Sequence, residues 1–212
     1  MDDERPTGSS AHDEAPRFDR HPGGYGRPVP RRRVLAAVGT TATVALAGCA
    51  GGGGDGDVPA AVTLTRDDTC DVCGMVIPNH PGPSSEIFYA DREPNGHPNP
   101  ARFDSTWEAF EFDFAREGWT REAFYVTDYS SVDYEIRQDD GQKLLSTHPE
   151  REAFVDAEAV TFVVGSAVVG AMGKDLIGFS DLADAEAFRD DHGGELATMD
   201  EVTPTMVGSL GM

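Results

Sequence analysis

The sequence AVTFVVGSAVVGAMGKDLIGFSD, residues 159–181, contains an apolar run at residues 159–164 whose length and β-branched content predict a buried strand. A second, shorter strand is predicted at residues 176–179. Ser180 and Asp181 follow at once, and their side chains are of the kind that begins a helix, because they accept hydrogen bonds from free backbone N–H groups of the first turn. This segment therefore predicts two strands followed by a helix.

A similar order of elements is predicted earlier in the chain. Residues 86–89 form a predicted strand, and Ser105 with Glu108 three residues later forms a capping box, which marks a helix start. A further strand is predicted after each helix, at residues 123–127 and 195–198. The predicted fold class is therefore α+β, with duplicated small sheet-plus-helix units of the ββαβ type that follow a cleaved signal segment.

Finer predictions fill in the folded domain, residues 62–212, whose subunits divide at about residue 130 (62–129 and 130–212). Short strands are predicted at residues 62–65 and 75–78. A polar linker joins the two units and contains Gln-Asp-Asp-Gly, a hairpin-turn signal. The apolar helix faces are predicted to be Trp107, Phe110 and Phe114 in the first unit and Leu182, Ala185 and Phe188 in the second.

Residues 1–48 have the composition of a twin-arginine-type lipoprotein signal peptide. Three arginines, residues 31–33, precede an apolar segment at residues 34–47, in an arrangement that resembles the twin-arginine export signal. Fourteen helical residues span about 21 Å, which is shorter than the roughly 30 Å hydrocarbon core, so a cleaved signal is predicted rather than a membrane-spanning helix. The segment ends in Leu-Ala-Gly-Cys, which resembles a lipobox and predicts lipidation of Cys49. The Gly-rich residues 49–61 are then a flexible tether to the outer face of the cytoplasmic membrane.

The composition is strongly acidic. The chain has 38 Asp and Glu residues against 17 Lys and Arg, with a formal charge of −21. This excludes a protein that holds nucleic acid through a basic surface, because phosphate binding needs clustered Lys and Arg. Residues 1–48 contain seven Arg and six acidic residues, so the rest of the chain carries −22. Abundant acids with only two lysines are typical of a halophilic protein, so we expect the exported part to work in high salt.

Two cysteines, Cys70 and Cys73, remain for chemistry once Cys49 is assigned to a lipid. A redox dithiol of this spacing normally opens a helix, whereas Gly74 follows Cys73 here. A structural zinc site needs two further ligands at short spacing, and the histidines of the exported part are scattered. A soft-metal site is the third possibility, because two thiolates and the thioether of Met75 are ligands that select Cu(I).

The motifs of this chain, taken in order, resemble the NosL family. They are the lipobox, CDVCGM at residues 70–75, FDS at 103–105, MGKDLI at 172–177 and HGG at 192–194. The resemblance covers residues 67–202. Members of that family are membrane-anchored lipoproteins that help to assemble the copper sites of nitrous oxide reductase. The resemblance therefore implies a duplicated α+β fold, Cu(I) binding by sulfur ligands and copper delivery.

The resemblance also adds Met172 to the candidate ligands, with a side chain that fills a gap in the core as the alternative. The candidate metal ligands are then Cys70, Cys73, Met75 and Met172. Asp104 is expected to be a helix-start residue, and His80 is expected to lie in a turn.

The predicted function is that of an exported, lipid-anchored Cu(I) chaperone with no catalytic turnover. The partners implied by the resemblance are a copper enzyme of denitrification, nitrous oxide reductase, and a membrane copper-export and assembly complex. The alternative function is enzymatic, a membrane-tethered thiol-disulfide oxidoreductase that uses Cys70 and Cys73.

Overall fold

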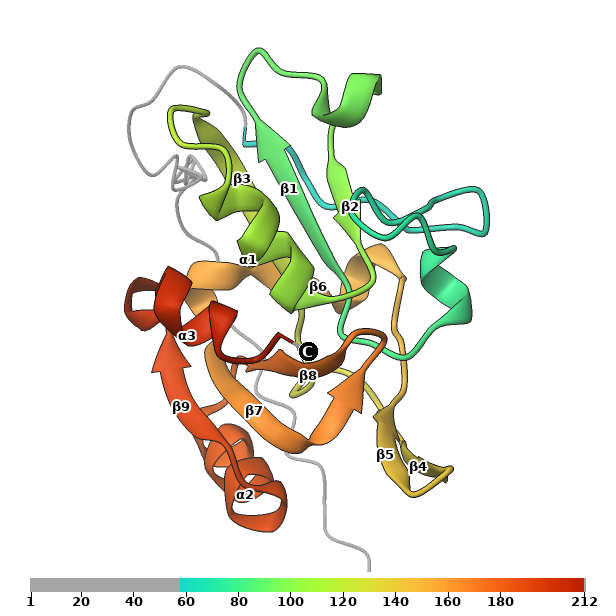
Figure 1. The fold of residues 1–212 in the computed structure, drawn as a ribbon, viewed down its shortest axis with the longest axis vertical. Coiled ribbons are helices and arrows are strands. Elements are labelled where there is room, and N and C mark those ends of the chain that lie inside the picture. The colour runs from blue at the N-terminus through green and yellow to red at the C-terminus, as the bar shows by residue number, and fades with distance from the viewer. Residues whose placement is uncertain (1–57, 212) are drawn as a thin grey trace, which may run out of the picture. The chain divides into compact units, whose positions relative to one another are not determined.

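The first sheet is built from a hairpin, a helix and a returning strand. The computed structural model describes residues 58–211, and Figure 1 shows how their helices and strands are arranged. In chain order this unit contains β1 (Ser85–Tyr89), β2 (Ala101–Phe103), α1 (Thr106–Phe114) and β3 (Arg121–Thr127). β1 is the central strand, because it pairs antiparallel with both β2 and β3.

The second sheet repeats this plan. Its elements are β7 (Thr161–Gly170), β8 (Gly173–Phe179), α2 (Leu182–His192) and β9 (Glu195–Thr198). β7 is the central strand and pairs antiparallel with both β8 and β9. The order β8-β7-β9 matches the order β2-β1-β3, so the predicted α+β fold of duplicated ββαβ units is confirmed.

The segment predicted as a polar linker contributes strands to both sheets. Its strands are β4 (Ile136–Asp139), β5 (Gln142–Leu145) and β6 (Phe154–Asp156). β4 and β5 form the predicted hairpin, with Asp140 and Gly141 at positive φ in its turn. β5 runs parallel to β7 in the second sheet, whereas β6 pairs with β3 in the first. The hairpin prediction is confirmed, but the segment does more than link the two units, because β5 and β6 each extend one of the sheets. Its polarity reflects the position of β4 at a sheet edge.

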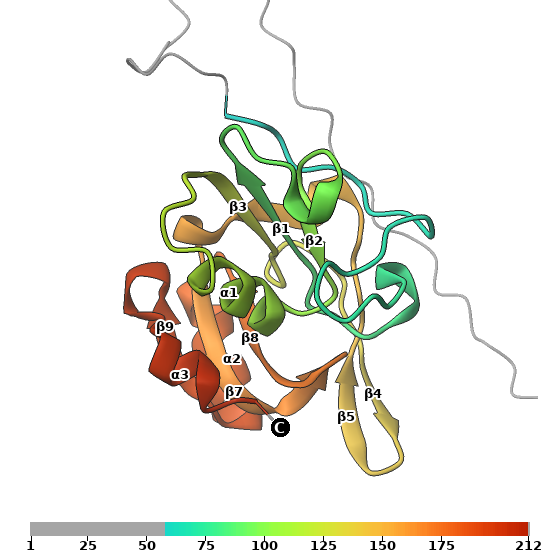
Figure 2. The same cartoon turned by 45° about the horizontal axis from the view of Figure 1, so that its top comes forward.

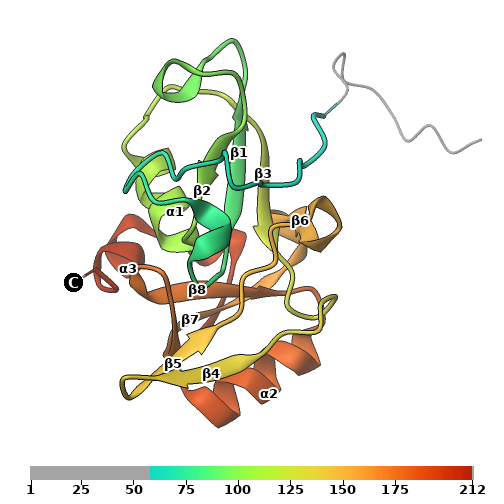
Figure 3. The same cartoon turned by 90° about the vertical axis from the view of Figure 1, so that its right-hand side faces the viewer.

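Two apolar clusters cover the two faces of the second sheet. Side chains alternate along β7, so Phe162 and Val164 enter one cluster and Val163 enters the other. In the first cluster the Phe110 ring of α1 lies 5.0 Å from the ring of Phe124 and 5.7 Å from that of Phe162. The second cluster lies beneath α2, which Figure 3 shows on the face of the second sheet turned away from β1 and β3. The first cluster therefore joins the two sheets, with α1 in contact with strands of both.

The predicted apolar faces of the helices are partly correct. The buried members are Phe110, Ala185 and Phe188. Trp107 is half-buried against the first cluster, and its indole N–H donates to the Val207 carbonyl at 2.9 Å. Val207 belongs to α3 (Pro204–Gly208), a short helix that lies beside α1 (Figure 2). Leu182 is 54 % exposed, so its predicted place in the core is wrong.

Two predicted short strands do not form. Residues 62–65 are extended but pair with no strand of the described part of the chain, and the Leu64 N–H donates instead to the Pro149 carbonyl at 2.8 Å. Residues 75–78 lead into a 3-10 turn, Ile77–Asn79, whose first residues include the proline that was expected to stop a strand. Proline is well suited to the first turn of a helix, because it lacks the N–H that would be unpaired there.

The predicted export signal, Cys49 and most of the predicted tether lie outside the described residues. Within residues 58–211, no helix combines the length and apolar character needed to cross a membrane. The Tyr125 hydroxyl donates to the Pro59 carbonyl at 2.7 Å, which fixes the start of the described chain to β3.

Each unit holds the helix start of the other unit through a buried aspartate. Asp175 on β8 accepts hydrogen bonds from the Ser105 hydroxyl and the Trp107 backbone N–H, both at 2.8 Å, where α1 begins. Asp128, just past β3, accepts from the Ser180 backbone N–H at 2.8 Å and from its hydroxyl at 2.7 Å, where α2 begins. Both aspartates are at most 2 % exposed. The two units therefore complete each other's helices.

Candidate metal centre

The two cysteines lie on a tight turn. A single antiparallel bridge between Thr69 and Val76 closes the turn. Inside it the Cys70 N–H donates to the Met75 carbonyl at 2.8 Å, and the Gly74 N–H donates to the Cys70 carbonyl at 3.0 Å. Gly74 has a φ of +76°, in the left-handed region that favours glycine. The glycine that argued against a helix in the sequence thus allows the chain to turn back on itself.

The start of α1 presents two carboxylates to this turn. Ser105 is the N-cap, and its hydroxyl accepts the Glu108 backbone N–H at 3.3 Å, which is one half of the predicted capping box. The other half does not form, because the Glu108 carboxylate accepts a hydrogen bond from Cys70 Sγ at 3.0 Å instead. Cys73 Sγ lies 3.4 Å from Oδ1 of Asp104. Asp104 directly precedes the N-cap and Glu108 lies in the first turn, so the start of the helix brings both carboxylates to the two thiols.

These four side chains form one group, called here the donor cluster. It consists of Cys70, Cys73, Asp104 and Glu108, and one donor atom of each lies within 4.8 Å of the others. Cys70 is 3 % exposed and each carboxylate residue is 1 % exposed, whereas Cys73 is half-buried. Cys73 is therefore the most accessible member.

Burial keeps both thiols protonated. Desolvation is the largest cause that raises the pKa of Cys70 far above its ordinary value, and the hydrogen bond with Glu108 raises it further. Desolvation also raises the pKa of Cys73, to which the negative charges of Asp104 and Glu108 add. Burial raises the pKa of Glu108 to about 7, with a further contribution from Asp104. A metal ion that binds both thiolates must therefore displace two protons.

Two sulfur and two oxygen donors determine which metals fit the cluster. Thiolates are soft ligands that suit Cu(I), whereas carboxylates are hard ligands that hold it weakly. Cysteine and carboxylate ligands also suit Zn(II), which accepts four of them in a tetrahedral arrangement. The raised thiol pKa values disfavour the oxidoreductase alternative, because the thiolate is the attacking species and reactive cysteines have lowered pKa values.

The donor cluster includes two residues to which the sequence analysis assigned other roles. Asp104 was expected only to start the helix, and Glu108 only to cap it. The N-cap is Ser105, and the Glu108 carboxylate contacts Cys70 rather than the Ser105 N–H, so its predicted capping role is wrong. The Asp104 carboxylate contacts Cys73, a role that the sequence analysis did not assign to it. The signal that points to them is a pair of acids four residues apart at a helix start, in a chain with a Cys-x-x-Cys pair. His80 ends the 3-10 turn through its backbone N–H and is not a member of the cluster.

The two candidate methionines are both half-buried, and their role as ligands stays a prediction. Met75 belongs to the cysteine turn itself. Met172 lies in the turn between β7 and β8, three residues before Asp175, which binds the start of α1. The hydrogen bond from the Trp107 N–H to Asp175 at 2.8 Å holds the start of β8 against the start of α1.

Comparison with known proteins identifies relatives of this chain. The sequence model of the NosL family matches residues 61–207. The copper-binding lipoprotein NosL of Stutzerimonas stutzeri is 30 % identical over 146 residues, which cover 69 % of this chain and 67 % of the relative. The crystal structure of the copper chaperone NosL from Shewanella denitrificans is similar with a TM-score of 0.56 and 30 % identity, over 71 % of this chain and 99 % of that chain. The matched range of the family contains both ββαβ units and the whole donor cluster.

Proposed function

Because the chain belongs to the NosL family, we propose that it binds Cu(I) at the donor cluster and delivers it to a copper enzyme. The observation that carries the proposal is the pair of thiols held with two carboxylates, donor atoms within 4.8 Å of one another. Two relatives support copper as the cargo, since they are named as a copper-binding lipoprotein and a copper chaperone. The choice of Cu(I) rests on the soft sulfur ligands, to which Met75 and Met172 would add thioethers.

The two carboxylates can accept the thiol protons that the metal displaces when it binds. Glu108 accepts a hydrogen bond from the Cys70 thiol, and Asp104 accepts one from the Cys73 thiol. Each proton that the metal displaces therefore has an acceptor at hydrogen-bonding distance. Neither carboxylate competes strongly for Cu(I), so these groups assist loading without preventing later release.

The unequal exposure of the two cysteines gives the transfer an order. Cys73 is half-buried and stands next to Gly74, where a Cβ atom would meet nothing within 4 Å. Val72 on the other side of Cys73 is 51 % exposed. A soft ligand of the receiving protein therefore reaches the metal at Cys73 first, while Cys70, 3 % exposed, holds it until last.

The destination of the copper follows from the family resemblance. We infer that the receiver is nitrous oxide reductase and that a membrane copper-export and assembly complex supplies the ion. Lipidation of Cys49 would anchor the chain at the outer face of the cytoplasmic membrane, in keeping with the acidic exported part. In this role the chain carries its cargo stoichiometrically and catalyses no reaction.

Anaerobic titration of the full chain with Cu(I) tests the proposal. We expect stoichiometric uptake in the presence of a competing chelator, and loss of uptake when Cys70 and Cys73 are both replaced by serine. The matched control is Cys49→Ser, which replaces the remaining cysteine of the chain and should leave uptake unchanged. Uptake that survives the double replacement, or a wild-type chain that takes up no copper, refutes the proposal. A parallel titration with Zn(II) measures how far the carboxylates favour the harder ion.

Transfer and anchoring need separate measurements. The Cu(I)-loaded chain is mixed with copper-depleted nitrous oxide reductase, and the recovery of reductase activity is followed against a free Cu(I) control. Anchoring is measured by cell fractionation of the wild-type and Cys49→Ala chains, of which only the wild type should stay with the membrane.

A further inference from the structure

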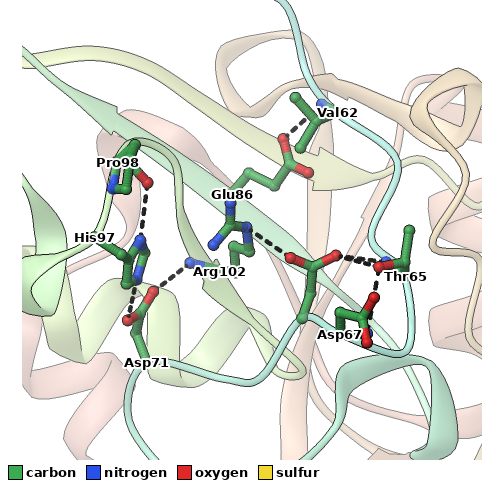
Figure 4. Close-up of polar contacts among 9 residues, drawn as sticks. Val62, Thr65, Asp67, Asp71, Glu86, His97, Pro98 and Arg102 are labelled. Carbon is green, nitrogen blue, oxygen red and sulfur yellow. Dashed lines mark hydrogen bonds and ion pairs between the residues drawn. The ribbon is translucent and has the colours of Figure 1, made fainter.

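Asp71, which lies between the two cysteines, is held from two sides (Figure 4). On one side its backbone N–H donates to the Arg102 carbonyl at 2.8 Å, and its Oδ2 accepts the Arg102 N–H at 2.7 Å. On the other side its Oδ1 lies 2.7 Å from His97 Nε2 and accepts from Asn95 Nδ2 at 2.9 Å. The Asp71 side chain is only 5 % exposed. The cysteine turn is therefore fastened both to β2 and to the loop at residues 90–100.

We propose that His97 and Asn95 are positioning residues, a clamp that acts through Asp71 to hold the cysteine turn in the geometry that binds the metal. The proposal rests on the proposed copper function of the donor cluster. Neither clamp residue belongs to that cluster. Asp71 is next to Cys70 and two residues from Cys73, so a movement of its backbone moves both thiols.

The local conformation of the loop shapes the clamp. Asn95 and Gly96 both have positive φ, +47° and +81°, and asparagine tolerates this left-handed region better than most residues. In this conformation Asn95 Nδ2 reaches the Asp71 backbone carbonyl at 2.7 Å as well as its carboxylate. Asn99 fastens the far end of the loop, since its side chain accepts the Tyr89 N–H at 3.2 Å and donates to the Tyr89 carbonyl at 2.7 Å. The loop is thus anchored at both ends.

His97 contributes both of its ring nitrogens to the clamp. Its Nδ1 lies 2.8 Å from the Pro98 carbonyl, and its Nε2 lies 2.7 Å from the Asp71 carboxylate. The ring is thus held between the backbone of its own loop and the cysteine turn, so it fixes the position of Asp71 relative to the loop.

Two arginines also lie near Asp71. The Arg102 side chain, drawn in Figure 4, is directed toward Asp68, with its Nε 3.3 Å from the Asp68 carboxylate. Arg116, just past α1, adds a second positive charge that acts on Asp71. The guanidinium of Arg102 is thus paired with Asp68, and His97 and Asn95 are the loop residues whose side chains contact the Asp71 carboxylate.

The expected effect is faster loss of copper. Removing a hydrogen bond to the surroundings of a metal site commonly lowers metal affinity by about 10- to 100-fold. We expect His97→Ala to speed Cu(I) release by about tenfold or more, and Asn95→Ala to act in the same direction. His97→Gln, which keeps a donor for Asp71, should recover part of the loss.

The experiment uses the full chain and two readouts. Cu(I) release to a chelator is followed at one fixed pH for all variants. Alkylation of Cys73 in the metal-free chain, quantified by peptide mass spectrometry, measures the freedom of the turn without any metal. His192→Gln is the matched control, because that histidine is also half-buried but lies at the end of α2 in the second unit. Thermal unfolding is recorded for every variant.

The clamp predicts faster Cys73 alkylation and faster Cu(I) release in the His97 and Asn95 variants, with unfolding temperatures close to that of the wild type and of His192→Gln. Wild-type alkylation and release rates in His97→Ala overturn the clamp. So does a His97→Gln variant that recovers none of the loss seen in His97→Ala, because the clamp requires only a donor to Asp71 at this position. A wild-type chain that takes up no Cu(I) refutes the proposed function instead, while the alkylation rates still decide whether the clamp holds the turn.

Discussion

Copper affinity is expected to rise steeply with pH, because each thiol of the donor cluster exchanges a proton for the metal. Desolvation raises the pKa of both Cys70 and Cys73, so the metal-free cluster is protonated at neutral pH and remains so as the pH falls. One displaced proton changes the affinity tenfold per pH unit, and two displaced protons change it about 100-fold, or about 2.7 kcal/mol. Affinity is therefore gained as the pH rises and lost as it falls.

The range of about pH 7.5 to 8.5 isolates the thiols. Glu108 has a pKa raised to about 7, so its carboxyl is mostly ionised above that value and contributes little to the slope. The affinity is measured by anaerobic competition with a Cu(I) chelator whose own proton dependence is known. The logarithm of the affinity plotted against pH should have a slope of about two for the wild type.

Single cysteine variants separate the contributions of the two thiol protons to this slope. Cys73→Ser should reduce the slope to about one, because only the Cys70 thiol then exchanges its proton. Cys49→Ser, which replaces the remaining cysteine of the chain, should keep the wild-type slope. A wild-type slope of one or less would refute the reasoning, since it would mean that at least one of the buried thiols is already ionised or does not bind the metal.

Three further predictions concern stability. Asp175→Ala leaves the Trp107 and Leu176 N–H groups without their acceptor, which should cost about 4 kcal/mol in urea unfolding; a loss below about 1 kcal/mol would show that water replaces the carboxylate. Burial raises the pKa of Asp175 from 3.8 to about 7, so between about pH 4 and 7 the folded protein binds a proton that the unfolded chain has lost. The free energy of unfolding should therefore fall as the pH rises through this range. The stability difference between wild type and Asp175→Asn should therefore shift toward the variant over that range, and a difference independent of pH would contradict the assignment. Phe110→Ala, which removes the ring between the two sheets, should cost about 3–5 kcal/mol, whereas Leu182→Ala should cost less than about 0.5 kcal/mol because Leu182 is 54 % exposed. Equal losses in thermal unfolding for these two variants would mean that the packing of α1 does not join the sheets.

The repeated strands and helices could be predicted from the sequence because their apolar patterns are local. Residues 159–164 are apolar throughout, and in the structure they belong to a strand with both faces covered. The N-cap residues Ser105 and Asp181 likewise mark the helix starts through contacts within one turn. By contrast, residues 62–65 have a strand-like pattern but bond to a loop, and β6 joins a sheet whose other strands are distant in the chain. These outcomes depend on long-range pairing, which no local pattern encodes.

The candidate site was predictable only in part for the same reason. The Cys-x-x-Cys spacing singles out Cys70 and Cys73 without any knowledge of the fold. Asp104 and Glu108 join them because packing brings the cysteine turn against the start of α1, 31 and 38 residues further along. A helix cap and a metal-site carboxylate look alike in sequence, because both are acids in the first turn of a helix. Their contact with the thiols had to come from the structure.

The hydrogen bond between Ser105 and Asp175 joins residues that are 70 positions apart in the chain. During synthesis the ribosome therefore produces the start of α1, with Asp104 and Glu108, well before the aspartate that fastens it. A nascent chain that stops before β8 has all four residues of the donor cluster but lacks the acceptor that holds the start of this helix. The last contact that positions the two carboxylates thus forms only after most of the second unit has been made.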